Sequence, residues 1–493
     1  MNAIIKETGP EITLATRTVR GGLWVLLARC VKWVLQFVRT VILARLLAPD
    51  DFGLFGIAFL SLNLLETFSV TGMRTALIQK RESIRPYLDT VWTIELIRAA
   101  VIALALFFCA PAIASFFNTP EAGPLVKVTG LAVLFQSLSN IAVVYYDKEI
   151  EYDRYFQLET ARAVSELMVA VVSFFIFRNV WAIMLGRIAG EMVYCVTSYR
   201  IHPYRPKFSC DIEKARHLFA YGRWILLSSI LIFTATQADG FFVGKFLGVM
   251  TLGFYQMAHK FTHLISTEMV FPVLKVTFPA YSKIQENMTR LKDAYLNVIR
   301  VIAFFAFLMA LILSILADDI VASLLGPTWA PVAVILQILV FPACLRVFQR
   351  TLAQMAKALG RPDVQTKVNI LQVVLLAIFI YPGAVYLGVA GVALVVAVQG
   401  AAAFLMLAGM VLPMIDLPYK VFLKLIARQL LAGFPAGILL FVIHRQLPAN
   451  LITLGFEVLL ATVLYVGTTR MLCRCAYQTL FKLKSELLNS SRC

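Results

Sequence analysis

Apolar blocks of twenty or more residues recur along almost the whole chain, and this feature restricts the fold most. A membrane-spanning helix needs about 20 consecutive apolar residues to cross a hydrocarbon core of about 30 Å. The chain is 60% hydrophobic and only 15% charged over its 493 residues, which leaves no segment for a large soluble domain. The sequence therefore predicts an all-α polytopic membrane protein.

We interpret the apolar blocks as about fourteen transmembrane helices. They are predicted over residues 21–47, 53–79, 88–117, 123–146, 156–177, 180–200, 218–245, 251–280, 296–316, 330–356, 365–386, 388–413, 420–445 and 450–474. With the N-terminus assigned to the cytoplasm, Lys and Arg gather in every second connection, as the positive-inside rule requires. This alternation supports the two more polar segments, 123–146 and 251–280, and places both termini in the cytoplasm.

A short internal repeat divides the predicted helices into two sets. The stretch "ARLLAPDDFGLFGIA" (44–58) aligns with "GKFLGVMTLGFYQMA" (244–258), which places Gly53 opposite Gly253. Each copy joins the first two helices of a set of six, so we expect two six-helix bundles in parallel repeat plus two C-terminal helices. The predicted divisions are a cytoplasmic N-terminal segment 1–20, a bundle 21–200, a linker 201–217, a second bundle 218–413, appended helices 414–474 and a cytoplasmic tail 475–493.

The corner within the first copy contains Pro49, Asp50 and Asp51. We interpret these residues as a break in the helix at the water boundary. Gly53 would then let the second helix start against a close neighbour.

The formal net charge is +17. In a soluble protein this excess would point to nucleic acid, but cytoplasmic loops of membrane proteins collect basic residues. The eight cysteines are mostly isolated in apolar runs and are interpreted as small apolar side chains. The first twenty residues lack a short apolar core with a cleavage site, so no removable signal peptide is expected.

Basic residues also recur on one face of two predicted helices. Arg29, Lys32 and Arg39 share a face of the first helix, and Arg346 and Arg350 are one turn apart in the tenth. An ionisable group at the bilayer centre costs at least about 2.5–3.5 kcal/mol, so it normally faces protein or a watery cavity. Neither stripe contains an acid, which favours a cationic cavity over snorkelling or loop pairing, although Arg29 lies close enough to the surface to snorkel.

A cationic cavity suits an anionic ligand, because Arg matches phosphate oxygens with a rigid fork of donors and Lys adds a point charge. The predicted substrate-binding residues are Arg29, Lys32, Arg39, Arg74, Lys260, Arg346 and Arg350. Aromatic side chains in the same helices have two interpretations. They could stack on sugar faces, but the ordinary interpretation is that they pack against lipid and neighbouring helices.

Other charges are spaced so that they neutralise one another. Glu95 and Arg98, and Arg187 and Glu191, have the spacing of pairs within one helix. The fifth predicted helix carries a mixed stripe of Glu159, Arg162 and Glu166, for which we expect acid–base pairing between helices.

Asp239 and Glu66 are the candidates for coupling transport to H⁺ or Na⁺. For Asp239, a pair with a basic residue of a neighbouring helix is the alternative. His259 and His263 lie one turn apart, but no third ligand accompanies them, so no metal site is expected. No glycine-rich phosphate loop with a lysine is present, so neither ATP hydrolysis nor a cofactor is expected.

Several stretches resemble a known family. They are "VILARLLAPDDFGLFGIA" (41–58), "ALIQKRES" (76–83), "QADGFFVGKFLGVMTLGFYQMAHKF" (237–261), "VTFPAYSKIQEN" (276–287) and "LLGPTWAPV" (324–332). They are similar to the Wzx-like bacterial polysaccharide flippases, the polysaccharide-transporter branch of the multidrug, oligosaccharidyl-lipid and polysaccharide exporter superfamily. The resemblance covers most of the chain and is strongest in 17–95 and 215–290.

This resemblance implies two facing bundles that rock between inward-open and outward-open states in the bacterial inner membrane. It implies undecaprenyl-pyrophosphate-linked oligosaccharide as cargo, for exopolysaccharide or lipopolysaccharide, and a polysaccharide polymerase and export machinery as partners. The last two helices, 420–474, would then form a groove for the lipid tail. Members often carry a basic residue after the acid of "ADGFF", whereas Gly240 stands here, which weakens an ion-pair role for Asp239.

Three alternatives remain at this point. A multidrug cation antiporter of the same superfamily would require an acidic cavity, whereas this sequence predicts a basic one. A membrane polysaccharide polymerase or ligase would carry a large periplasmic loop with catalytic basic residues, and the longest outward connection here, about 316–330, is short. A scaffold for the assembly machinery would not transport. The expectation is a transporter and not an enzyme.

Overall fold

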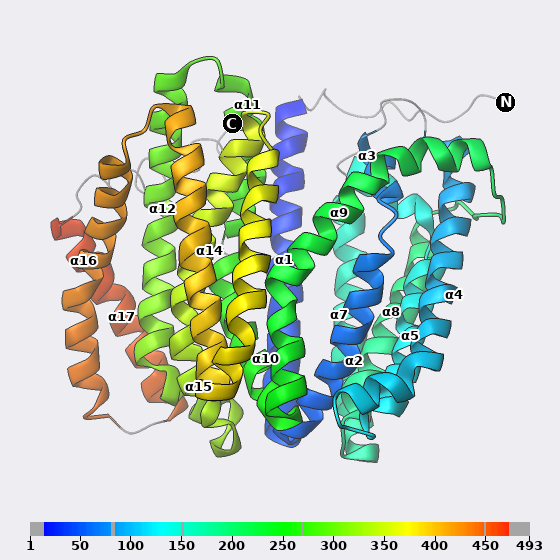
Figure 1. The fold of residues 1–493 in the computed structure, drawn as a ribbon, viewed down its shortest axis with the longest axis horizontal. Helices are drawn as coiled ribbons and strands as arrows, with labels where there is room; N and C mark the ends of the chain where they lie inside the picture. The colour runs from blue at the N-terminus through cyan, green and yellow to red at the C-terminus, as the bar shows by residue number, and fades with distance from the viewer. Residues whose placement is uncertain (1–13, 80–83, 149–151, 269, 448–449, 473–493) are drawn as a thin grey trace. The chain divides into compact units, whose positions relative to one another are not determined.

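The computed structural model describes residues 14–79, 84–148, 152–268, 270–447 and 450–472. Within these ranges the chain forms helices joined by short connections and contains no β-strand (Figure 1). The predicted tail 475–493 and most of the predicted segment 1–20 lie outside the described residues. The helices form two compact units. Unit 1 comprises Met1–Leu47 and Ser61–Ile230, and unit 2 comprises Ala48–Leu60 and Leu231–Cys493.

Unit 1 is built from long helices. The chain returns to this unit within α2 and leaves it within α9. Its elements are α1 (Leu14–Leu46), the second half of α2 (Pro49–Phe68), α3 (Met73–Gln79), α4 (Arg85–Phe116), α5 (Ala122–Leu138), a 3₁₀ turn (Ile141–Val143), α6 (Val144–Lys148), α7 (Tyr152–Phe177), α8 (Trp181–Ile201) and the first part of α9 (Ile212–Phe242). Within the unit, α7 packs against both α1 and α8, and α4 packs against α5.

Unit 2 contains the start of α2, the end of α9 and all later elements. These are α10 (Val249–His263), α11 (Val270–Ile284), α12 (Met288–Ile315), α13 (Ala317–Ile320), a 3₁₀ turn (Pro327–Trp329), α14 (Pro331–Ala358), α15 (Asp363–Val411), a 3₁₀ turn (Pro413–Ile415), α16 (Tyr419–His444) and α17 (Leu451–Leu472). Single π-helical turns at Val243–Leu247, Leu264–Glu268 and Val321–Leu325 interrupt the α-helices.

Nine helices of the described residues are long and apolar enough to cross a membrane, and Ala122–Leu138 is a shorter apolar helix. One of the nine, Asp363–Ile415, holds two predicted segments, because Gly388 (φ 61°) breaks α15 in the middle. The prediction of an all-α multi-pass membrane protein is confirmed. The count of fourteen stays a prediction, as do the bundle boundaries 21–200 and 218–413 and the appendage 414–474.

Two predicted segments are not single helices. The segment 53–79 ends as a helix at Phe68, turns at Gly72 (φ 68°) and restarts as α3. The segment 251–280 is interrupted by the π-helical turn Leu264–Glu268 between α10 and α11. The polar residues inside both segments are the sign of these interruptions that is visible in the sequence.

The corner between α1 and α2 contains the predicted break, since α1 ends at Leu46 and α2 begins at Pro49. Pro49 opens α2 as its first residue, where the missing N–H costs nothing. Asp50 and Asp51 follow in the first turn, where acids are favoured by the helix dipole, and the Asp51 carboxylate accepts a hydrogen bond from the Ala48 N–H at 3.2 Å.

The two copies of the repeat pack against each other within unit 2. A Cβ atom on Gly53 of α2 would overlap the backbone carbonyl of Val249, and one on Gly253 of α10 would overlap that of Pro49. In the alignment Pro49 corresponds to Val249 and Gly53 to Gly253, so the two contacts are reciprocal. Glycine at both positions lets the two backbones approach this closely.

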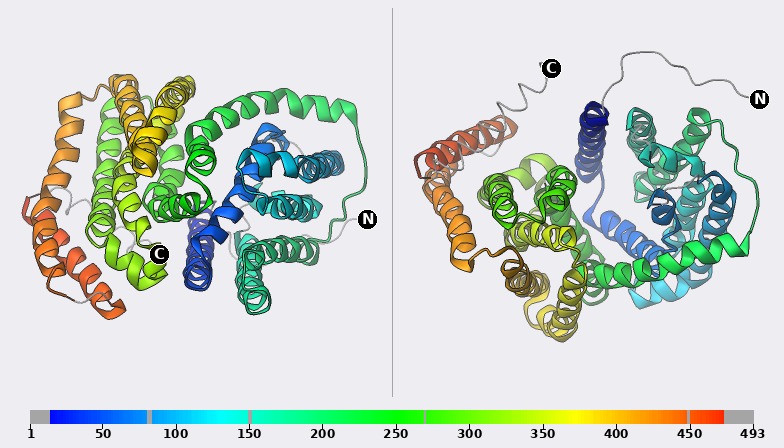
Figure 2. Two further views of the ribbon diagram at one scale, coloured as in Figure 1. Left: turned by 60° about the horizontal axis from the view of Figure 1, so that its bottom comes forward. Right: turned by 90° about the horizontal axis from the view of Figure 1, so that it is seen from above.

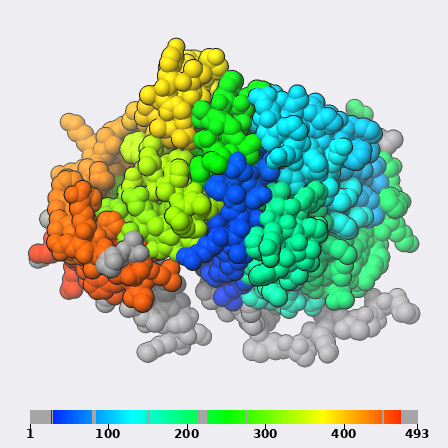
Figure 3. All heavy atoms as spheres, turned by 90° about the horizontal axis from the view of Figure 1, so that it is seen from below, coloured from blue at the N-terminus to red at the C-terminus, as the bar shows by residue number. Residues whose placement is uncertain are grey.

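The C-terminal helices belong to unit 2. α16 packs against α12 and α17, and α17 also reaches α12. Figure 2 shows this pair, in orange and red, beside the green helix α12 in both views, and Figure 3 shows their atoms as one flank of the unit. Tyr295 of α12, Phe348 of α14, Phe404 of α15 and Phe422 of α16 are buried in one core cluster, which joins α16 to the rest of unit 2.

The connection between α8 and α9 is held against α4. The Asp89 carboxylate accepts hydrogen bonds from the Tyr204 hydroxyl at 2.8 Å and the Lys207 N–H at 2.7 Å. The Thr93 hydroxyl accepts a third, from the Ser209 N–H at 3.0 Å. Burial, followed by the contact with Asp89, raises the pKa of Tyr204, so the hydroxyl remains a neutral donor at physiological pH. These three hydrogen bonds form a clasp that holds the connection to α4.

Candidate functional site

The basic stripe of α1 faces acids on α7. The Lys32 ammonium lies 2.5 Å from the Glu159 carboxylate, and the Arg39 guanidinium pairs with Glu166. Both acids are buried, with side chains 8% and 3% exposed. Two charges of the predicted cationic stripe are therefore neutralised within unit 1, and Arg29 lies partly buried on the same helix.

A second rank of pairs joins α7 to α8. Glu191 pairs with Arg162 of α7 and with Arg187 of its own helix, the latter at 2.9 Å. Arg187 also approaches Glu166 at 3.9 Å. The predicted Arg187–Glu191 pair and the predicted neutralisation of the mixed stripe on α7 are confirmed.

The third predicted pair is also present. Arg98 pairs with Glu95 on α4 at 2.8 Å, and it donates further hydrogen bonds to the Glu66 backbone carbonyl at 3.4 Å and the Ser69 hydroxyl at 3.3 Å. Glu66 and Arg74 both fall in the single predicted helix 53–79. They lie on different helices, because the chain turns at Gly72, and Arg74 is exposed on α3.

The acids and bases of these ion pairs thus nearly balance. The spacing of residues within α1 does not show these partners, because the compensating carboxylates come from a helix more than one hundred residues away. The spacing of Glu159 and Glu166, seven residues apart, matches that of Lys32 and Arg39 and is the signal that points to the pairing.

The basic stripe of α14 in unit 2 differs from that of α1. Arg346 and Arg350 are partly buried, and neither forms an ion pair or hydrogen bond with an acidic side chain of the described residues. Their charged neighbours include each other and, for Arg350, Glu268. This pair therefore keeps its donors available to an anion. Lys260 is exposed on α10, with its ammonium 5.6 Å from the centre of the Phe52 ring.

Asp239 lies at the end of α9 within a shell of polar groups. Its carboxylate accepts hydrogen bonds from the Tyr255 hydroxyl at 2.7 Å and the Gly240 N–H at 2.8 Å, and His259 Nε2 lies 3.4 Å away. The Asp239 side chain is 7% exposed. Tyr255 also has Arg346 as a charged neighbour, so the shell of Asp239 adjoins the basic pair of α14. Sequence reasoning missed Tyr255 as the direct partner of Asp239.

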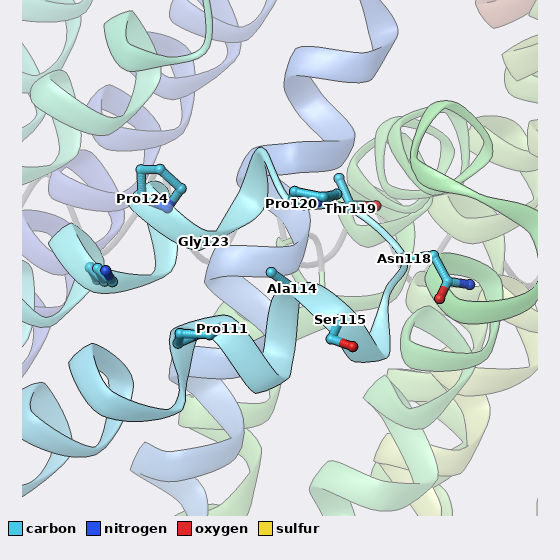
Figure 4. Close-up of a pocket in the computed structure, with 9 residues that line it drawn as sticks. Pro111, Ala114, Ser115, Asn118, Thr119, Pro120, Gly123 and Pro124 are labelled. Atoms are coloured by element: carbon cyan, nitrogen blue, oxygen red, sulfur yellow. The ribbon is translucent and has the colours of Figure 1, made fainter.

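A hollow of about 560 Å³ lies elsewhere, at the turn between α4 and α5 (Figure 4). It is lined by Pro111, Ala114, Ser115, Asn118, Thr119, Pro120, Gly123, Pro124 and Lys127. The Lys127 ammonium is the one charge in this lining and lies 5.3 Å from the centre of the Phe107 ring. No predicted site residue lines this hollow, so volume does not mark the charged site here.

A model of the family described as polysaccharide biosynthesis protein matches residues 42–334. The match covers more than half of the chain and includes both copies of the repeat corner and Asp239. The chain belongs to the polysaccharide biosynthesis protein family. The predicted resemblance to polysaccharide flippases is thereby confirmed.

Curated relatives extend this similarity over most of the chain. The lipopolysaccharide biosynthesis protein WzxC of Escherichia coli K12 is 23% identical over 389 residues, which is 78% of either chain. The succinoglycan biosynthesis transport protein ExoT of Rhizobium meliloti 1021 is 24% identical over 326 residues, 65% of either chain. The teichuronic acid biosynthesis protein TuaB of Bacillus subtilis 168 is 20% identical over 356 residues, 72% of this chain and 73% of its own.

Solved structures show the same fold at low identity. The lipid II flippase MurJ in an inward closed conformation has a TM-score of 0.74 at 15% identity, covering 92% of this chain and 99% of that chain. An inward-facing multidrug resistance transporter of the MATE family, in the MOP superfamily, has a TM-score of 0.61 at 16% identity, covering 79% and 98%. This chain thus shares the fold of these two transporters, and the MurJ likeness extends over more of it.

Proposed function

We propose that the protein is a flippase that moves undecaprenyl-pyrophosphate-linked oligosaccharide repeat units across the bacterial inner membrane. The repeat units would serve exopolysaccharide or lipopolysaccharide biosynthesis. Membership of the polysaccharide biosynthesis family supports the pathway, and the MurJ-like fold supports a membrane transporter with a lipid-linked cargo.

The observation that carries the proposal is the basic pair Arg346 and Arg350. Arginine inside a membrane protein is costly and normally pairs with an acid, as Arg39, Arg162 and Arg187 do in unit 1. The pair on α14 has no such partner among the described residues. Two guanidinium groups one helical turn apart offer two forks of donors, which suit the oxygens of a pyrophosphate.

Transport would proceed by alternating access, with both termini in the cytoplasm. Asp239 is the proposed coupling group for H⁺, or for Na⁺ in its place, because it is a buried carboxylate whose shell adjoins the basic pair. Binding of the anionic cargo at Arg346 and a change of charge at Asp239 would then influence each other electrostatically. A polysaccharide polymerase and the export machinery are the proposed recipients of the cargo.

The test replaces both arginines by alanine in a strain that lacks the chromosomal gene. The matched control is Lys357→Ala, which removes an exposed cation from the same helix. We expect Arg346→Ala/Arg350→Ala to abolish surface polysaccharide and to accumulate lipid-linked repeat units while the protein stays in the membrane at normal level. The control variant should export normally. Arg346→Lys/Arg350→Lys should recover only part of the export, because lysine keeps the positive charge but lacks the forked donors of the guanidinium group.

If the alanine double variant is present in the membrane and exports polysaccharide normally, the assignment of the anion site is overturned. Failure of the purified wild-type protein to translocate lipid-linked repeat units in vesicles would overturn the flippase proposal itself.

A further inference from the structure

Three ionisable side chains converge in unit 2 away from the basic pair. Asp319 lies on α13, His444 is the last residue of α16, and Glu457 lies on α17. His444 Nδ1 is 3.3 Å from Asp319 Oδ2 and 3.2 Å from Glu457 Oε1, and the three ligand atoms all lie within 4.8 Å of one another. We propose that this cluster is a binding site for a divalent transition-metal cation such as Zn²⁺.

The burial of the cluster makes it costly without a cation. The side chains of Asp319, His444 and Glu457 are 10%, 18% and 0% exposed. Among the described residues, His444 is the one basic side chain that pairs with either carboxylate. Even a protonated histidine would leave one negative charge unbalanced, whereas a divalent cation with neutral histidine and two carboxylates gives a neutral site.

The distances also fit a metal site. The contact of His444 with Glu457 at 3.2 Å is within hydrogen-bond range, and both contacts, at 3.2 and 3.3 Å, are longer than the about 2.7–2.9 Å of charge-assisted hydrogen bonds. Ligands placed about 2.0–2.1 Å from a tetrahedral zinc ion are separated from one another by about 3.3 Å. The two separations match the edge length of such a coordination shell.

A further atom of the cluster has no partner. Glu457 Oε2 is buried and makes no hydrogen bond with the described residues, although its side chain is fully enclosed. A buried carboxylate oxygen without a donor is destabilising, and coordination of a cation by the same carboxylate would satisfy it. Imidazole together with carboxylate ligands suits Zn²⁺ better than Mg²⁺, which prefers oxygen ligands alone.

The three ligands come from three helices, so a bound cation would connect them. His444 and Glu457 lie on either side of the connection between α16 and α17, and Asp319 lies just beyond the end of α12. The cation would hold the C-terminal pair of helices to α13. Its role is accordingly structural, with the fourth position of the tetrahedron left to water.

The experiment measures zinc on the full-length protein purified in detergent without chelator. We expect about one Zn²⁺ per chain by mass spectrometry, removal by EDTA with a fall in the thermal unfolding midpoint, and recovery of both on adding ZnCl₂ but not MgCl₂. Asp319→Asn and Glu457→Gln preserve side-chain size and should each weaken Zn²⁺ binding by at least about 10-fold. Removing even a residue that only hydrogen-bonds to a metal ligand lowers metal affinity by about 10-fold or more.

The matched control is Asp318→Asn, which neutralises the exposed neighbour of Asp319 on the same short helix and should bind Zn²⁺ like the wild type. Size-exclusion chromatography checks that each variant is folded. If one of the two ligand variants does not fold, the other is enough to test the proposal. Absence of Zn²⁺ binding by the wild type, or equal binding by the ligand variants and the control, would overturn the proposal.

Discussion

Arg39 of α1 forms a buried ion pair with Glu166 of α7. The two side chains are 14% and 3% exposed, and they join helices that are distant in sequence. The pair shows that the intramembrane charge of unit 1 serves largely to fasten α1 to α7. The availability of a cation for an anionic ligand is therefore decided by its partners and not by its position in an apolar segment.

Neutralising one member of this pair should destabilise unit 1. In Glu166→Gln, the buried Arg39 loses its counter-charge, a change that typically costs about 3–5 kcal/mol. Denaturant or thermal unfolding of the purified protein measures the loss, and Arg39→Gln combined with Glu166→Gln should recover part of it. Asp363→Asn is the control, because Asp363 makes exposed ion pairs with Arg361 and Lys367 that contribute little. Equal loss in both single variants would contradict the structural role of the buried pair.

The reciprocal glycine contact should tolerate no side chain. Gly53→Ala places a methyl group against the Val249 carbonyl, and overpacking of this kind costs about 1–3 kcal/mol or more. We expect a lowered yield of monodisperse protein and a lowered thermal midpoint. Gly467→Ala on α17 is the control, because its new methyl group would meet nothing within 4 Å. A Gly53→Ala protein that unfolds like the wild type would show that α2 and α10 are not closely packed.

Replacement of Asp239 tests ion coupling directly. Asp239→Asn keeps the size of the side chain and its acceptor oxygen for the Tyr255 hydroxyl, but it cannot exchange a proton. We expect transport in vesicles to lose its stimulation by an imposed pH gradient, or by an Na⁺ gradient, while the protein remains folded. Persistent stimulation by either gradient would remove Asp239 as the coupling group, and Glu66→Gln would then be the next variant to measure.

The clasp on the α8–α9 connection predicts a change in protease sensitivity. Asp89→Ala removes the acceptor shared by the Tyr204 hydroxyl and the Lys207 N–H, and hydrogen bonds to a charged group contribute about 1.5–3 kcal/mol each. Trypsin should therefore cleave after Lys207 several-fold faster in this variant; Arg205 precedes Pro206 and is not a trypsin site. Asp153→Ala, which removes an exposed acid of α7, should leave the rate unchanged. Unchanged cleavage in both would mean that the clasp does not protect the segment.

The sequence was sufficient for the fold class because the hydrocarbon core imposes one length on every spanning helix. It was also sufficient for pairs within one helix, such as Glu95–Arg98, because helical spacing fixes which side chains meet. It did not show that Lys32 meets Glu159, because contacts between helices depend on how the helices pack. The turn at Gly72 was missed as well, although the polar residues Ser69, Thr71 and Arg74 around it are visible in the sequence.

The cluster of Asp319, His444 and Glu457 was missed as well, although one trace of it is visible. Glu457 is an acid inside an apolar helix, and such a residue is by default a candidate for function. Asp319 lies in a short connection and His444 at a helix end, where polar residues are ordinary. Only the packing of α13, α16 and α17 brings the three together.

The reciprocal contact of Gly53 and Gly253 also bears on how such a chain arose. Gly56 likewise lies against Gln256, its counterpart in the aligned copy. In a two-fold symmetric dimer, residue i of one subunit contacts residue j of the other and j contacts i, and this corner has that form within one polypeptide. A half-length ancestor would have met a second copy of itself through the same surface before gene duplication and fusion. Gln256 opposite Gly56 then marks a place where the fused halves diverged.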